Sequence, residues 1–204
     1  MNIQEQIAAN RNFCKSPFAE ERELSDQQKR LPQPPLCKPA QSEQRIPLSR
    51  DFHSVITETD FFTILQKRTS QRFYRDEAMT LEQLSFLLWA TQGVKSIRGN
   101  HYATLRTVPS GGARHAFETY LAVRKVTGLS AGVYHYLPLE HALEPIGPLE
   151  NPQEQITAAM HGQKWAGNCA VAFLYSFVAY RAEWRYSTSA HRVALIDAGH
   201  VVQN

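Results

Sequence analysis

Two strand-like segments that lie close together in the chain restrict its fold more than any other feature. Residues 119–126 are rich in Tyr, Leu and Val, and residues 133–137 have the sequence VYHYL. Aromatic and β-branched runs of this kind favour strands. The short connection between them contains Gly128 and Gly132, which suit a turn. The two segments therefore predict a β-hairpin.

A helix is predicted between residues 80 and 93. Thr80 and Gln83 have the spacing of a capping box, in which each side chain satisfies a backbone N–H of the other residue. Gly93 supplies a stop. Leucines at the spacing of one helix face support the prediction, at positions 81, 84, 87 and 88.

Further elements follow from the same rules. Thr59 or Asp60 can cap a helix, and so can one of the residues 187–189. Residues 171–178 are apolar at successive positions, which predicts a central strand covered on both faces. The helices are expected over residues 61–68, from Pro152 through Met160, and from Ala190 onward.

The N-terminal part of the chain has a different composition. Residues 1–50 hold six of the eleven prolines, at 17, 32, 34, 35, 39 and 47, among Gln, Ser, Lys and Glu. Such a composition disfavours a packed core. We expect an arm or linker over residues 1–50, either a partly disordered tail or a segment that binds a partner through residues 32–39. One domain is expected over residues 51–204.

Composition limits the functional classes. A chain of 204 residues with 43% hydrophobic content can bury one sizeable core. The net charge of +3 is too small to indicate nucleic-acid binding. Three widely spaced cysteines do not suggest a disulfide framework. The N-terminus lacks the unbroken apolar stretch of a signal peptide, and the longest mainly apolar run, 169–179, is far shorter than the roughly 20 residues of a membrane helix. We expect a cytoplasmic protein that does not bind a membrane.

Residues 68–72 (RTSQR) are the first candidate ligand site. Arg68 and Arg72 carry guanidinium forks that match phosphate oxygens, and Thr69 and Ser70 add hydroxyl groups. The pattern favours a phosphate monoester. A solvated basic helix end is the alternative interpretation.

Residues 109–112 are the second candidate. Pro109 and Ser110 precede two adjacent glycines, Gly111 and Gly112, whose lack of Cβ lets the backbone approach a flat or anionic ligand. The alternative is a turn in which glycine serves backbone geometry alone.

The sequence resembles the nitroreductase-like, FMN-dependent oxidoreductases. Residues 68–74 (RTSQRFY) are similar to the family's Arg-Arg-Ser-x-Arg-x-Phe motif, with Thr69 in place of the second arginine. Residues 109–114 (PSGGAR), followed by ETY at 118–120, are similar to its Pro-Ser-x-Gly-x-Arg and Glu-x-Tyr segments. The order of further motifs resembles the SagB-type branch, which oxidises azoline rings in ribosomal peptides: IPL at 46–48, LLWATQG at 87–93, GVYHY at 132–136 and DAGH at 197–200.

The resemblance implies an α+β fold, with a mostly antiparallel central sheet flanked by helices and FMN bound where two copies of a homodimer meet. It assigns phosphate and ribityl contacts to residues 68–72 and places the glycine loop along the flavin ring, where backbone amides stabilise the charge of the reduced ring. The implied cofactor-binding residues are Arg68, Thr69, Ser70, Arg72, Pro109, Ser110, Gly111 and Gly112.

A Lys-Tyr pair is proposed to handle the proton in the SagB-type branch, and Arg185 and Tyr186 occupy the corresponding place. Arginine remains protonated near neutral pH and is not a base, so the role would fall to Tyr186. A purely structural Tyr186 on the lip of a strand is the alternative. His115 and Glu118 are three residues apart without a second ligand pair, so no metal site is expected.

The implied reaction transfers hydride from a thiazoline or oxazoline of a modified peptide to the flavin, which oxygen or another acceptor reoxidises. Two rivals remain: an NAD(P)H-dependent reductase of small nitro or quinone substrates, and a flavin-less scaffold partner in a peptide-modifying complex. The final helix has no C-cap before Asn204, and relatives continue further, so we expect the C-terminus to be incomplete.

Overall fold

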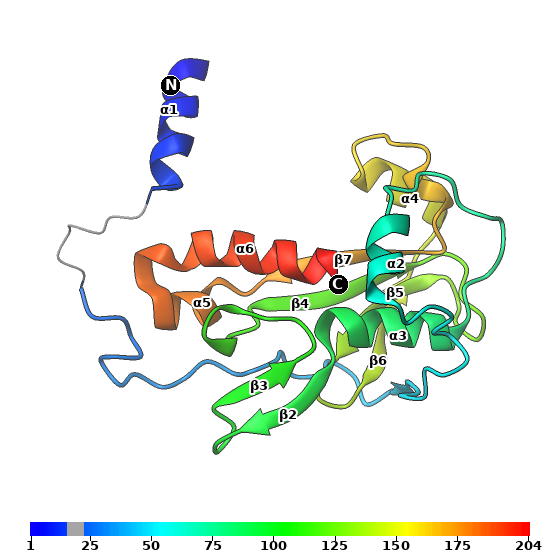
Figure 1. Ribbon diagram of the computed structural model, residues 1–204, viewed down its shortest axis with the longest axis horizontal. Coiled ribbons are helices and arrows are strands. Elements are labelled where there is room, and N and C mark those ends of the chain that lie inside the picture. The colour runs from blue at the N-terminus through cyan, green and yellow to red at the C-terminus, as the bar shows by residue number, and fades with distance from the viewer. Residues whose placement is uncertain (16–22) are drawn as a thin grey trace.

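An antiparallel five-stranded sheet with helices around it forms the body of the protein (Figure 1). The computed structural model describes residues 1–15 and 23–204. The strand order is β1-β6-β5-β4-β7, and every pairing is antiparallel. The α+β fold is confirmed. Its strands are β1 (Ile46–Pro47), β4 (Phe117–Val123), β5 (Gly132–Leu137), β6 (Ala142–Pro148) and β7 (Val171–Phe177).

A separate hairpin of two strands projects from the body (Figure 1). Strand β2 (Val94–Arg98) follows the end of α3 directly and pairs with β3 (Ala103–Arg106). The helices are α1 (Ile3–Phe13), α2 (Phe61–Lys67), α3 (Leu81–Gln92), α4 (Pro152–Ala159), α5 (Ala179–Tyr186) and α6 (Ala190–Gln203).

The predicted hairpin is the centre of the sheet. Strands β4 and β5 pair with Tyr120 opposite His135. Leu121 of β4 packs with Leu84 and Leu88 of α3 in the main core cluster, and all three are fully buried. Burying a leucine side chain contributes about 1.5–3 kcal/mol. Helix α3 therefore covers the sheet through the leucine face that the sequence indicated.

Three of the predicted helix starts, those of α2, α3 and α4, are confirmed. In α3, Thr80 Oγ1 accepts a hydrogen bond from the Gln83 N–H at 3.2 Å, and Gln83 Oε1 accepts one from the Thr80 N–H at 2.9 Å. In α2, Asp60 is the cap and accepts from the Thr63 N–H at 2.9 Å. Helix α4 begins at Pro152 as expected.

Two predictions about the C-terminal part are wrong. Strand β7 pairs only with β4 among the described strands, so it is an edge strand and not a central one, and Leu174 is 45% exposed. Tyr186 ends helix α5, which the sequence did not predict, and does not lie on the lip of a strand. Helix α6 begins after Ser189 as expected, although no side-chain hydrogen bond caps it.

The part of the N-terminal segment from residue 23 to 50 contacts the body through its backbone. Glu118 accepts a hydrogen bond from the Lys38 N–H at 2.7 Å, and Glu144 accepts one from the Gln41 N–H at 2.7 Å. These buried carboxylates flank the His135 ring at 3.1 and 2.8 Å. The prediction of Pro17 as part of an arm falls outside the described residues. The domain boundary near residue 50 stays a prediction.

Candidate functional site

A polar cleft of about 510 Å³ opens between the β2–β3 hairpin, the glycine loop and the end of α5. It joins three of the residues singled out from the sequence, namely Ser110, Gly112 and Arg185. Tyr102 lies on the hairpin side. The remaining lining residues are Arg98, Ala103, Leu105 and Ala113.

The glycine loop packs tightly against α5 and α6. Gly112 has φ +56°, a left-handed conformation that favours glycine, and a Cβ there would overlap the Arg185 side chain. A Cβ on Gly111 would overlap Val193 of α6 and approach the Tyr186 hydroxyl to 3.5 Å. Both glycines are therefore required for the loop to lie beside the predicted catalytic pair.

Asp197 of α6 fixes the start of this loop, a role that the sequence analysis did not assign. Its carboxylate accepts a hydrogen bond from Ser110 Oγ at 2.6 Å and from the Gly111 N–H at 3.0 Å. Ser110 Oγ in turn accepts from the His115 N–H at 2.9 Å. The Gly111 amide thus donates to Asp197 within the chain, and the contact of this loop with a flavin stays a prediction. The loop presents Cβ-free backbone at Gly112.

Arg185 of the predicted catalytic pair lines the same cleft, and Tyr186 follows it in the chain. Arg185 Nη1 donates to Tyr102 Oη at 2.8 Å and to Gln27 Oε1 at 3.2 Å, and the guanidinium lies 5.7 Å from the centre of the Tyr186 ring. Both residues are half-buried. The geometry places the Arg185 guanidinium next to Gly112 and the Tyr186 phenol next to Gly111.

A buried histidine supports the loop from behind. His115 is 5% exposed, and burial, together with the nearby Arg106 guanidinium, lowers the pKa of His115 to about 3. It is therefore neutral in the folded protein near pH 7. No cluster of three or more His, Cys, Asp or Glu ligands occurs among residues 1–15 and 23–204.

The other predicted cofactor-binding segment, residues 68–72, does not line the polar cleft. Arg68, Thr69, Ser70 and Arg72 are all exposed in the loop after α2. The Arg72 guanidinium lies 5.8 Å from the Trp165 ring centre, and Thr69 Oγ1 accepts from Gln71 Nε2 at 2.6 Å. Within the described part of the chain, no hydrogen bond or cation–π contact links this segment to the glycine loop. A single chain does not bring the two segments together.

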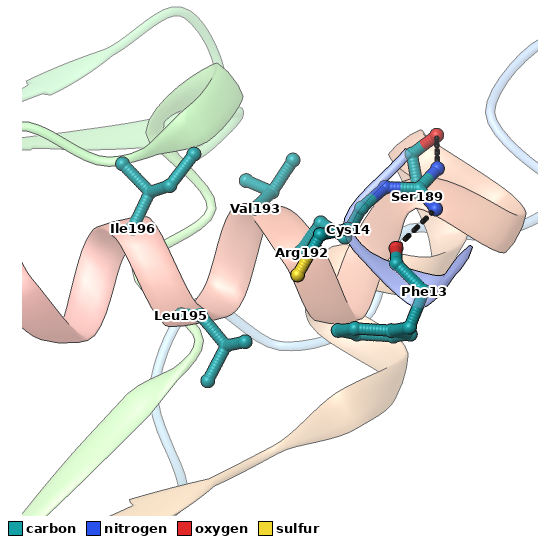
Figure 2. Close-up of a pocket in the computed structure, with 7 residues that line it drawn as sticks. All are labelled: Phe13, Cys14, Ser189, Arg192, Val193, Leu195 and Ile196. Atoms are coloured by element: carbon teal, nitrogen blue, oxygen red, sulfur yellow. Dashed lines mark hydrogen bonds between the residues drawn. The ribbon is translucent and has the colours of Figure 1, made fainter. Parts of the chain in front are cut away.

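A second, more apolar cleft of about 430 Å³ lies along α6, where the end of α1 meets it (Figure 2). Arg192 donates to the Phe13 carbonyl at 3.0 Å and to Ser189 Oγ at 3.1 Å, which ties the two helices together. Figure 2 shows Val193 and Ile196 projecting from one side of α6 and Leu195 from the other.

The helices of the described residues are all too short or too polar to cross a lipid bilayer.

The α+β fold, with a glycine loop between an antiparallel sheet and its C-terminal helices, defines the nitroreductase-fold class. The Nitroreductase family matches residues 65–204. The chain belongs to this family.

Three proteins are similar to this chain at moderate sequence identity. The chain is 34% identical over 149 residues to putative nitroreductase MJ1384 of Methanocaldococcus jannaschii, covering 73% of this chain and 72% of that protein. It is 29% identical to the microcin B17-processing protein McbC of Escherichia coli, over 61% of this chain and 45% of McbC. It is 33% identical to the trifolitoxin-processing protein TfxB of Rhizobium leguminosarum, over 52% of this chain and 30% of TfxB. The chain thus spans less than half of the two peptide-processing relatives. The predicted resemblance to the SagB-type branch is confirmed.

Solved structures share the fold. A putative nitroreductase from Ralstonia eutropha superposes with a TM-score of 0.60 at 24% identity, over 92% of this chain and 77% of that one. A chain of the E. coli microcin synthetase McbBCD complex superposes with a TM-score of 0.52 at 20% identity, over 99% of this chain and 77% of that one.

Proposed function

We propose that the protein is an FMN-dependent SagB-type dehydrogenase that oxidises azoline rings in modified peptides. The observation that carries the proposal is that Gly112 and Arg185 line one cleft, while Tyr186 packs beside Gly111 of the same loop. The naming of two relatives as peptide-processing proteins supports the choice of substrate.

The residues present suit FMN. Arg68 and Arg72 are exposed cations next to the Ser70 hydroxyl, a donor set that matches a phosphate monoester. Gly112 offers a backbone surface free of Cβ, which suits a flat ring. Arg68, Ser70 and Arg72 would hold the phosphate, and residues 109–112 would lie against the ring.

The proposed site needs two copies of the chain. The two segments are separate in one chain, so a homodimer in which one copy supplies residues 68–72 and its partner supplies the glycine loop would complete the site. Exposed apolar side chains on α2 and α6 suit such an interface. On α2 they are Phe61 (71% exposed), Phe62 (66%) and Leu65 (51%), and on α6 Leu195 (65%), Ile196 (61%) and Val202 (71%).

The chain's own residues would then act as follows. Bound flavin supplies a hydride acceptor for one carbon of the azoline ring. Tyr186 is assigned the transfer of the proton that the neighbouring ring atom gives up, and the adjacent Arg185 guanidinium would stabilise negative charge that develops beside it. The position of Tyr186 against Gly111 keeps its hydroxyl next to the loop that would carry the ring.

The first rival is a nicotinamide-dependent nitro or quinone reductase, which the similarity to MJ1384 supports. Anaerobic mixing of the yellow protein with either NADPH or a thiazoline peptide separates the two functions. We expect the flavin absorbance to bleach with the peptide and to yield a thiazole. Fast bleaching by NADPH with no reaction of the peptide contradicts the proposal.

The second rival is a flavin-less scaffold partner, and membership of a peptide-modifying complex remains part of the proposal because of the likeness to a McbBCD chain. Purification followed by FMN titration distinguishes it. A protein that is colourless and takes up no FMN at micromolar concentration would act as a scaffold and not as the dehydrogenase.

A further inference from the structure

The polar cleft carries more positive charge than the proposed reaction uses, because only Arg185 has a role in that reaction. Arg98, at the exposed end of β2, and Arg185, at the end of α5, both line it. Arg114 lies directly behind it, 4% exposed. None of the residues that line the cleft is acidic.

The partners of these arginines are neutral. Arg185 donates to a phenol and an amide, as described above, and Arg114 donates to the carbonyls of Gly112 and Tyr102 at 3.0 and 2.9 Å. The Arg114 guanidinium also lies 4.8 Å from the Tyr102 ring centre and 5.4 Å from that of Trp184. No salt bridge to Arg98, Arg114 or Arg185 forms within the described ranges of the chain.

The Asp197 carboxylate contacts the glycine loop and accepts hydrogen bonds from Ser110 and Gly111. Burial lowers the pKa of Arg114, and the positive charge of Arg185 lowers it further, so the two cations disfavour one another. A negative group that enters the cleft relieves this repulsion. Guanidinium binds a carboxylate through two parallel hydrogen bonds.

We propose that this cleft recognises a carboxylate on the peptide substrate, namely an Asp or Glu side chain near the ring to be oxidised. The inference rests on the proposed function, because it names a feature of that same substrate. The cleft, of about 510 Å³, would receive this acidic side chain beside the ring that the proposed function places against Gly112. Leu105 on the hairpin, 40% exposed, offers apolar contact to the rest of the peptide.

Arg98 lines the cleft, and within the described part of the chain it makes no hydrogen bond to the glycine loop or to the catalytic pair. It is therefore the specificity residue to test. Lys95 is the matched control: it is an exposed cation on the same strand that does not line the cleft. The two variants are Arg98→Gln and Lys95→Gln. Thermal unfolding monitored by circular dichroism verifies that both remain folded.

The probes are two synthetic thiazole peptides that differ only in Glu or Gln beside the ring and carry an uncharged fluorophore. A thiazole is already oxidised, so binding is measured by fluorescence anisotropy without turnover. We expect the Glu peptide to bind about fivefold more tightly than the Gln peptide, about 1 kcal/mol for an exposed ion pair. The Arg98→Gln variant loses the preference, and Lys95→Gln keeps it.

Equal affinity for the two peptides, no binding of either, or a preference that survives Arg98→Gln overturns the inference. NADPH is added as a competitor, because its phosphates offer the same anionic chemistry. Stronger binding of NADPH than of the Glu peptide at this cleft assigns it to a dinucleotide and also overturns the inference.

The assay is run on FMN-free and on FMN-saturated protein. Absence of FMN binding contradicts the proposed function, while the peptide preference is still measured on the same sample. FMN binding and peptide oxidation without a Glu preference contradict only the inference about the carboxylate.

Discussion

Asp197 is the residue on which the geometry of the glycine loop depends. Its buried carboxylate, 6% exposed, accepts hydrogen bonds from Ser110 Oγ and from the Gly111 N–H. A hydrogen bond to a charged group contributes about 1.5–3 kcal/mol, so removing the acceptor from two donors costs about 3–6 kcal/mol. Water that enters the vacated space lowers the cost, and we expect Asp197→Ala to lose about 3 kcal/mol. Asp197→Asn keeps the volume and one acceptor, and should lose about 1–2 kcal/mol.

Urea unfolding at fixed protein concentration measures these changes. With a denaturant slope of about 2 kcal/mol/M, a loss of 3 kcal/mol lowers the midpoint by about 1.5 M. His200→Ala, an exposed position one turn further along α6, is the control and should change the free energy of unfolding by less than about 0.5 kcal/mol. A double-mutant cycle of Ser110→Ala with Asp197→Asn should give a coupling of about 1–2 kcal/mol. Strictly additive effects would show that the two side chains do not interact and would refute the reasoning.

Three further outcomes are expected. Arg72→Ala should weaken FMN binding about tenfold in equilibrium dialysis, and Arg75→Ala, an exposed neighbour, should not; equal retention of FMN by both contradicts the phosphate assignment. Tyr186→Phe should keep FMN and slow turnover of a thiazoline peptide about a hundredfold, and an equally active variant removes Tyr186 from the proton transfer. The pKa of His115 is about 3 in the folded protein against 6.5 as its ordinary value, so its contribution to stability is complete above about pH 6.5 and is lost as the pH falls, by about 2 kcal/mol at pH 5. In the His115→Asn variant, the free energy of unfolding should fall less steeply as the pH decreases below about 6.5. An unchanged pH dependence would assign the loss of stability to other groups.

Local signals in the sequence predicted the elements whose ends are defined by neighbouring residues. The capping box at Thr80 and Gln83 forms as expected, because both partners lie within one helical turn. The hairpin of β4 and β5 follows from a short glycine-containing connection. Both depend on contacts that are close in the chain.

Features that depend on distant contacts were not predictable in this way. Strand β7 is apolar like a central strand, yet its position at the sheet edge depends on which strands pair with it. Helix α5 carries Tyr, Arg, Glu and Trp without a cap side chain, so no start signal marks it. Asp197 lies far along the chain from Ser110, and only the packing of α6 on the glycine loop brings the two together.

In the candidate site too, the local motifs were predictable and the contacts between distant segments were not. The glycine loop and the pair Arg185 and Tyr186 were picked out separately from motifs, and the fold packs them against one another, with Arg185 and Gly112 lining one cleft. The charge of that cleft was not predicted, since Arg98 and Arg114 belong to segments whose relative position depends on the β2–β3 hairpin.

Complementation between two defective copies tests the central claim, a flavin site shared by two chains. Arg72→Ala impairs one predicted half of the site, and Gly112→Ala impairs the other, because the new Cβ would displace Arg185. Each variant alone should bind FMN weakly. After the two are mixed and allowed to exchange subunits, tight FMN binding should return, at one FMN per mixed dimer, because one of its two sites receives both intact halves. If the mixture binds FMN no better than either variant alone, the two segments do not meet across a dimer and the account is contradicted.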